Sequence, residues 1–223
     1  MKKQSLAAAF LAGALVLSSC GASNAVKGAG IGAAGGAGIG AGIGRVLGNT
    51  AVGAVIGGVV GGTAGTLIGK KMDKQKKELE RDVKDAKIES VNDGQAIRVT
   101  FDSGILFATG KATLSTSSQQ ELRKFAANLQ SHTQTDILIV GHTDNTGSDK
   151  INEPLSLDRA GSVRSFLASQ GVSTARMQVE GKGSREPIAD NSTAAGRQEN
   201  RRVEVYILPN KAMIEAAQNG TLK

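Results

Sequence analysis

Apolar and polar residues follow one another in the second half of the chain in patterns that predict strands. Residues 96–101 place an apolar side chain at every second position, as a strand does when one of its faces is buried. Residues 136–141 are apolar almost throughout, which predicts a buried central strand. Two further runs, at residues 177–181 and 203–208, predict the remaining strands.

Helical periodicity separates these strands. Within residues 117–130, the apolar side chains Leu122, Phe125 and Leu129 recur on one helical face. A second helix is predicted at residues 157–170, with a glycine directly after it as its stop. The order of strands and helices predicts an α+β fold, a two-layer sandwich with a mixed sheet.

A glycine-rich segment, residues 28–69, precedes this domain. It holds 17 of the 30 glycines, and its only charged residue is Arg45. Glycine recurs at every fourth position, with one extra residue in the middle, and therefore occupies one face of a helix. In water each interior glycine costs about 1 kcal/mol relative to alanine, whereas in a membrane such a face lets helices approach closely. The pattern favours a helical glycine zipper that associates with a membrane or with other copies, and a flexible linker is the alternative.

The second part of this segment has the length of a membrane span. Residues 51–69 are 19 uncharged residues, just enough to cross a bilayer as a helix. A hairpin that turns near residues 45–50 would leave Lys27 and Lys70 on the same side of the membrane. If the segment spans the membrane in this way, the alternative function is pore formation or perturbation of the membrane.

A charged stretch, residues 70–91, links the glycine segment to the domain. Between residues 70 and 89 there are 8 basic and 6 acidic residues and no glycine or proline, which predicts a helix. Met72, Leu79 and Val83 form a thin apolar stripe at near-heptad spacing. We expect a solvated spacer helix of roughly 33 Å, and weak pairing with a neighbouring helix is the alternative.

The start of the chain has the pattern of a targeting segment. A basic beginning and a short apolar core predict a signal peptide at residues 1–19. Residues 17–20 resemble the bacterial lipobox, in which the thiol of Cys20 would be acylated, and two or three acyl chains anchor a protein stably. Gly21 stands where an aspartate would retain a lipoprotein in the inner membrane, so the resemblance implies the outer membrane. An ordinary signal peptide with an incidental cysteine is the alternative.

The charge of the chain is unevenly distributed. The formal net charge is +7, but residues 92–223 hold 15 Lys/Arg and 14 Asp/Glu, a net of +1. The domain therefore lacks the basic surface of a nucleic-acid-binding protein, and only 3% of the residues are aromatic. We expect no nucleic-acid partner, and a single cysteine excludes an intrachain disulfide.

An acid and a base follow the central strand at positions where they could hold a zwitterion. Asp144 comes three residues after the end of the predicted strand 136–141, and Arg159 lies near the start of the predicted helix 157–170. Arginine offers a rigid fork of donors to a carboxylate, and an aspartate accepts hydrogen bonds from an ammonium. Because aromatic residues are scarce, stacking on sugar rings is not expected to supply the affinity.

Several separated motifs share their order with one family. The motifs 141–147, 155–160 and 200–205 resemble those of the OmpA-like peptidoglycan-binding domain, found in outer-membrane proteins, Pal-type lipoproteins and flagellar stators. The resemblance covers about residues 96–208, roughly half of the chain. It implies the same two-layer fold and, as ligand, the meso-diaminopimelate residue of the peptidoglycan stem peptide. The free end of that residue has an ammonium and a carboxylate on one carbon.

The resemblance also implies a set of ligand-binding residues. Asn152 corresponds to a polar residue that lines the pocket, and Arg201 is expected to reach the carboxylate side of the ligand. Phe107 and Thr109 border the pocket, in a segment that departs from the commoner version with aspartate or asparagine. The expected binding residues are Asp144, Arg159, Asn152, Arg201, Thr143, Phe107 and Thr109.

Two other interpretations of these residues remain open. Asp144 and Arg159 could pair with each other only to close the domain, because a buried charge is most often neutralised by a partner. His142 and Ser156 suggest a hydrolase, but no cysteine, glutamate cluster or histidine spacing completes a metal or catalytic set. We therefore expect no enzymatic activity, metal or cofactor.

The sequence as a whole predicts an outer-membrane lipoprotein whose domain faces the periplasm. It would bind peptidoglycan without covalent bonds and anchor the envelope to the wall, with the lipid bilayer as second partner and the glycine zipper as a route to homo-oligomers. The predicted segments are a signal peptide (1–19), an acylated start with a short linker (20–27), the glycine zipper (28–69), the spacer (70–91), the binding domain (92–208) and a tail (209–223) that begins with a short helix (209–218).

Overall fold

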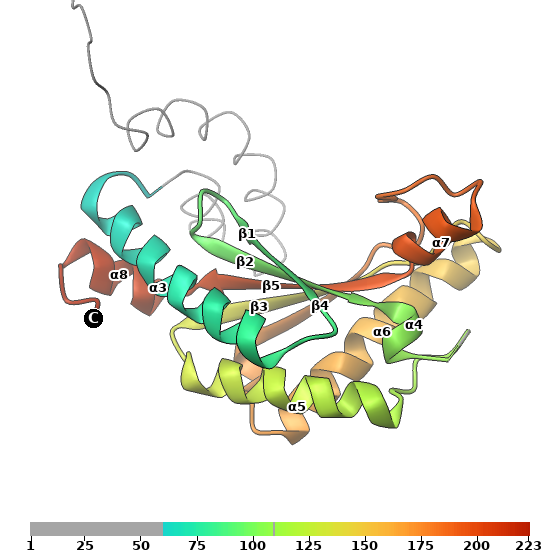
Figure 1. Cartoon of the computed structure of the whole chain (residues 1–223), viewed down its shortest axis with the longest axis horizontal. Helices are drawn as coiled ribbons and strands as arrows, with labels where there is room; N and C mark the ends of the chain where they lie inside the picture. The colour runs from blue at the N-terminus through green and yellow to red at the C-terminus, as the bar shows by residue number, and fades with distance from the viewer. Residues whose placement is uncertain (1–59, 109) are drawn as a thin grey trace, which may run out of the picture.

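The computed structural model describes residues 60–108 and 110–223 (Figure 1). In chain order its elements are α3 (Gly62–Asp82), β1 (Lys87–Val91), β2 (Ala96–Asp102), α4 (Ser103–Leu106), α5 (Thr116–Ser131), β3 (Thr135–Gly141), α6 (Asp149–Ser169), a 3-10 turn (Thr174–Arg176), β4 (Met177–Gly181), α7 (Ala194–Asn200), β5 (Arg202–Pro209) and α8 (Lys211–Gln218).

The strands form one mixed sheet in the order β1-β2-β5-β3-β4. Only β3 and β4 are parallel, and β5 lies antiparallel between β2 and β3. The apolar run of β3 is buried along nearly its whole length, as its continuous pattern predicts. The predicted α+β sandwich with a mixed sheet is confirmed.

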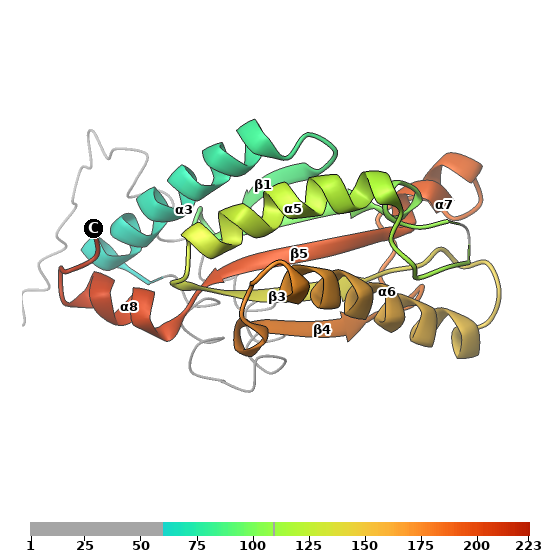
Figure 2. The same ribbon diagram turned by 90° about the horizontal axis from the view of Figure 1, so that it is seen from below.

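Helices α3, α5 and α6 cover one face of the sheet (Figure 2). Val99, Ile139 and Val205 lie side by side on this face and are fully buried. Phe101 of the sheet meets Phe125 of α5 edge to face, with ring centroids 5.6 Å apart. The apolar face predicted for α5 is the face that packs on the sheet.

Helix α3 is not the solvated spacer that its charges suggest. Its apolar stripe packs into the main core, where Ile68, Met72 and Leu79 are at most 1% exposed. The side chain of Gln75, on the same stripe, donates a hydrogen bond to the buried Asn128 of α5 at 3.0 Å. The thin near-heptad stripe is therefore the docking face of the helix on its own domain, and the prediction of a free rod is wrong.

The predicted boundary between glycine segment and spacer also moves. Residues 62–69 form the first turns of α3, and Ile68 is buried in the core of the domain. Ala64 and Ile68, which lie within the predicted span 51–69, are therefore part of the core of the domain. Among residues 60–108 and 110–223, no helix has the length and hydropathy of a membrane span. The predicted signal peptide, the acylation site Cys20 and residues 28–59 of the glycine segment lie outside the described residues.

Two further boundaries differ from the sequence-based expectation. Helix α6 starts at Asp149, earlier than the predicted start at residue 157. The sequence pattern missed these first turns because Pro154, which lacks a backbone N–H, lowers the helical signal there. Strand β1 was expected to be part of the spacer, but it pairs antiparallel with β2. The turn between them has positive φ at Asn92, Asp93 and Gly94, residues that tolerate this conformation.

Candidate functional site

The candidate site lies at the end of the sheet where β3 stops and the chain turns towards α6. Gly141 is the last residue of β3, and a Cβ there would overlap the carbonyl oxygen of Ser156, so this close approach of strand and helix requires glycine. The N–H of His142 donates to the carbonyl oxygen of Arg202 at 2.9 Å. The loop that contains Asp144 therefore leaves the sheet from a fixed position.

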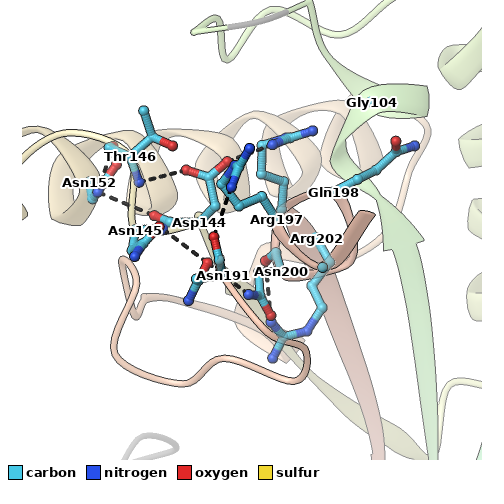
Figure 3. Close-up of polar contacts among 12 residues, drawn as sticks. Gly104, Asp144, Asn145, Thr146, Asn152, Asn191, Arg197, Gln198, Asn200 and Arg202 are labelled. Atoms are coloured by element: carbon cyan, nitrogen blue, oxygen red, sulfur yellow. Dashed lines mark hydrogen bonds and ion pairs between the residues drawn. The ribbon is translucent and has the colours of Figure 1, made fainter. Parts of the chain in front are cut away.

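Asp144 is a buried carboxylate with two partners (Figure 3). Its Oδ2 accepts a hydrogen bond from Nη1 of Arg201 at 2.5 Å, and its Oδ1 accepts one from the N–H of Thr146 at 2.8 Å. Burial alone would raise the pKa of Asp144, but the hydrogen bonds from Arg201 and Thr146 outweigh burial and hold the pKa below its ordinary value. Asp144 is therefore an anion at neutral pH.

Arg159 is a buried cation beside this carboxylate. Its side chain is 3% exposed, its Nε donates to the carbonyl oxygen of Lys111 at 3.0 Å, and its guanidinium lies 5.3 Å from the ring centre of Phe107. Burial and the nearby charge of Arg201 lower the pKa of Arg159, and the charge of Asp144 opposes them. Neither Nη atom of Arg159 has a hydrogen-bond partner among the described residues.

The ion pair at the site differs from the simplest expectation. Within the described part of the chain, the partner of Asp144 is Arg201, and no ion pair joins Asp144 to Arg159. The two oppositely charged groups are thus neighbours that remain available to other partners. Such an arrangement has a donor fork and a carboxylate at one place, as recognition of a zwitterion requires.

Two other predicted residues, Asn152 and Thr143, hold the loop that contains Asp144 in place through hydrogen bonds. Nδ2 of Asn152 donates to the carbonyl oxygens of Asp144 at 3.3 Å and Thr146 at 3.1 Å, so this amide fastens the loop to α6. The N–H of Thr143 donates to the carbonyl oxygen of Gly183 at 2.9 Å. The hydroxyl of Thr143 is buried and has no hydrogen-bond partner in the described structure.

Asn200 is a structural residue of the site to which the sequence analysis gave no role. It is fully buried at the end of α7, and its Oδ1 accepts from the N–H groups of Ile188 at 2.8 Å and Ala189 at 3.0 Å. Its Nδ2 donates to Oδ1 of Asn191, which also accepts from the N–H of Asn145 beside Asp144 (Figure 3). The only signal in the sequence was its place directly before the two arginines of the closing motif.

The structure gathers most of the predicted binding residues but not the hydrolase candidates. Ser156 donates to the carbonyl oxygen of Glu153 at 2.8 Å and accepts from the N–H of Gly183, so its hydroxyl is engaged. Neither ring nitrogen of the buried His142 has a hydrogen-bond partner among the residues described. Thr109 lies outside the described residues. In residues 60–108 and 110–223, no group of three or more His, Cys, Asp or Glu residues is placed to hold a metal ion.

Behind the site, a polar cluster lies on β5. Glu204 accepts from Nε of Arg202 at 2.7 Å and from the hydroxyl of Tyr206 at 2.7 Å. Nε2 of His142 is 3.8 Å from Glu204. Burial and the charge of Arg202 lower the pKa of His142 to about 4, so this ring is neutral at pH 7.

Two family models match the chain. The OmpA family matches residues 106–201, which include Asp144, Arg159 and Arg201, and the YMGG-like Gly-zipper matches residues 1–73. "Probable lipoprotein YiaD" of Escherichia coli (strain K12) is 35% identical over 138 residues, 62% of this chain and 63% of that protein. YfiB of the same organism is 45% identical over 108 residues, 48% of this chain and 68% of that protein.

A solved structure shares both fold and sequence with the domain. The cell wall anchor of the T6SS from Pseudomonas aeruginosa superposes with a TM-score of 0.54 at 30% identity, and the match covers 60% of this chain and 96% of that one. The chain spans less than two thirds of the length of YiaD. The similarity therefore lies in the sheet-and-helix domain that holds the site.

Proposed function

The chain belongs to the OmpA family, and we propose that its domain binds the meso-diaminopimelate residue of the peptidoglycan stem peptide without covalent chemistry. The observation that supports this most is Arg159, a buried guanidinium whose Nη atoms have no partner among the described residues, beside the buried carboxylate of Asp144. Nη atoms without a protein partner can donate two parallel hydrogen bonds to a carboxylate.

The chemistry of the two groups matches the free end of diaminopimelate. The Nη atoms of Arg159 would donate to its carboxylate, and Asp144 would accept from its ammonium. A carboxylate has about four lone-pair sites, and in the structure Arg201 and Thr146 each use one of them. The ammonium can thus bind to Asp144 while the pair with Arg201 stays in place, and Arg201 would add positive charge on the carboxylate side.

Anchoring follows if the two ends of the chain bind different layers of the envelope. We propose that acylated Cys20 holds the chain in the outer membrane, that the domain faces the periplasm, and that the glycine zipper adds membrane contact or self-association. The match to the YMGG-like Gly-zipper and the similarity to a probable lipoprotein and to a cell wall anchor support this role. No catalytic step is part of it.

The test is calorimetric titration of the protein with a stem peptide that contains diaminopimelate. Arg159→Ala should abolish binding, and Arg159→Lys should weaken it by about tenfold or more because lysine keeps the charge but loses the fork. A stem peptide with lysine in place of diaminopimelate lacks the carboxylate at its free end and should also bind at least about tenfold more weakly.

The matched control is Arg123→Ala. Arg123 also lies over an aromatic ring, 5.9 Å from the centre of Phe166, but on α5, away from the site. This variant should bind like the wild type. A folded Arg159→Ala protein that still sediments with diaminopimelate-type sacculi as well as the wild type would contradict the proposed site. Equal binding of both stem peptides would keep the wall as ligand but exclude diaminopimelate specificity.

A further inference from the structure

The solvent-facing side of α3 has a row of basic residues, which we call the lysine stripe and define as Lys70, Lys74 and Lys77. Their spacing of four and three residues places them on one side of the helix, opposite the stripe that packs into the core. Asp73 lies beside the stripe and is the only acid between residues 67 and 77, where there are five lysines.

The charges of the lysine stripe are not neutralised within the domain. In the described structure, none of its three lysines has an ion pair or a hydrogen bond, whereas the neighbouring Lys76 pairs with Glu80 at 2.5 Å. All three side chains are exposed. They are therefore available to an anionic partner, and no internal pair has to break first.

A cleft of about 470 Å³ opens beside the first turns of this stripe. Its walls come from α3, from the end of α5 and the turn that follows it, and from α8 with the end of the chain after it. Lys70, Lys74 and the partly buried Leu67 line one side, and Met213 and Leu222 supply apolar surface on the other. The combination of ammonium groups with an apolar floor suits an amphiphile that has an anionic head.

This basic end lies opposite the candidate site. Figure 1 shows the start of α3 beside α8 at one end of the molecule and α7 with the start of α6 at the other. The residues that precede Val60, including the predicted acylation site Cys20, join the domain at the basic end. A membrane anchor would therefore bring this end to the bilayer first.

We propose that the lysine stripe and its cleft bind the anionic phospholipid headgroups of the membrane in which the chain is anchored. This rests on the membrane association in the proposed function. Lys70 and Lys77 are about 10 Å apart along the helix, so the stripe presents its charges over a length that a surface with many phosphates matches better than a single ion. Lysines near an anionic membrane add attraction residue by residue. Docking in this way would point the wall-binding site away from the membrane.

The experiment measures lysine accessibility in the full acylated chain, reconstituted in vesicles of phosphatidylcholine alone or mixed with phosphatidylglycerol. Labelling with an amine-reactive reagent is quantified by mass spectrometry for each lysine. In the mixed vesicles, labelling of Lys70, Lys74 and Lys77 should be about fivefold lower, and 1 M salt, with a Debye length of about 3 Å, should restore it. Lys111 and Lys150, exposed at the other end, serve as internal controls and should not change.

Several results would overturn the proposal. Equal labelling of the stripe in both vesicle types would exclude lipid docking. Protection by inorganic phosphate in phosphatidylcholine vesicles would indicate a single-anion site, and protection that depends on protein density would indicate a second copy of the chain. The triple variant Lys70→Gln/Lys74→Gln/Lys77→Gln removes the stripe but not the wall-binding site, so it should still sediment with sacculi. This separates failure of lipid docking from failure of wall binding.

Discussion

Asp144 stays ionised in a buried position because Arg201 and the N–H of Thr146 stabilise its negative form. If Arg201 is replaced by glutamine, burial dominates and the pKa of Asp144 rises. We expect Arg201→Gln to bind the diaminopimelate peptide about tenfold more weakly at pH 7, and to lose further affinity, roughly threefold or more, between pH 7 and pH 5. The wild-type protein should bind equally at both values, because its Asp144 remains charged. Calorimetry at the two pH values measures this.

Arg185→Gln is the control for this prediction, because Arg185 is an exposed arginine near the same end that pairs with Glu153 and not with Asp144. Its affinity and pH dependence should match those of the wild type. If Arg201→Gln binds as tightly at pH 5 as at pH 7, the ion pair does not set the charge of Asp144.

His142 makes stability depend on pH. Its pKa is about 4 in the folded protein and near 6.5 when unfolded, so below pH 6.5 the unfolded state takes up a proton that the folded state resists. The free energy of unfolding should therefore be full above pH 6.5 and fall as pH drops towards 4, by roughly 2 to 3 kcal/mol at pH 4.5. His142→Leu should remove this part of the pH dependence of the free energy of unfolding, measured from urea unfolding curves at a series of pH values. If the free energy of unfolding falls with pH equally in the two proteins, His142 is not buried as a neutral ring.

At this scale the sequence identified residue types but not all of their contacts. The order of the motifs located Asp144 and Arg159 beside the end of β3, and the structure places both there in buried positions. The pairing of Asp144 with Arg201 joins residues 57 positions apart and depends on how α7 leads into β5. Side-chain proximity of this kind comes from tertiary packing, which periodicity and spacing do not encode.

Among the elements, α3 is the one whose sequence pattern predicted the helix but not the surface on which it packs. The apolar stripe through Met72 and Leu79 predicted a helix correctly, and the helix exists. A stripe of this width looks the same whether its partner is another helix or the chain's own sheet. The many charged residues favoured the prediction of a solvent-exposed helix. The strands were easier to predict because β3 is buried on both faces and β2 on one, so their patterns report their position directly.

The docking of α3 predicts a large effect of core truncation in this helix. Leu79 is fully buried in the main core, so Leu79→Ala should lower the free energy of unfolding by about 2 to 5 kcal/mol. Lys77→Ala, two residues away on the exposed side, should change it by no more than about 0.5 kcal/mol. Urea unfolding followed by circular dichroism measures both. A Leu79→Ala protein as stable as Lys77→Ala would mean that α3 is a free spacer after all.

For the molecule as a whole, α3 connects two functions at opposite ends. The lysine stripe lies on its exposed side, its buried side joins the same core as β3, which ends just before the loop that holds Asp144, and its 21 residues span about 31 Å. A flexible spacer would let the domain turn freely on its anchor. A docked helix instead fixes the direction of the wall-binding site relative to the basic end, so membrane contact and wall contact become properties of one rigid body.

This rigidity predicts that ligand bound at one end protects amides at the other. If α3 unfolds only with the rest of the domain, a diaminopimelate peptide at about 100 times its dissociation constant should raise the free energy of global unfolding by about 2.7 kcal/mol. Core amides of α3, such as those of Met72 and Leu79, should then exchange with deuterium about 100-fold more slowly, although they do not touch the ligand. The lysine-type stem peptide, at the same concentration, is the control; because it binds at least about tenfold more weakly, it should slow their exchange by about tenfold or less. Protection confined to the loop around Asp144, with α3 exchanging as before, would show that the helix opens independently and that the direction of the site is not fixed by it.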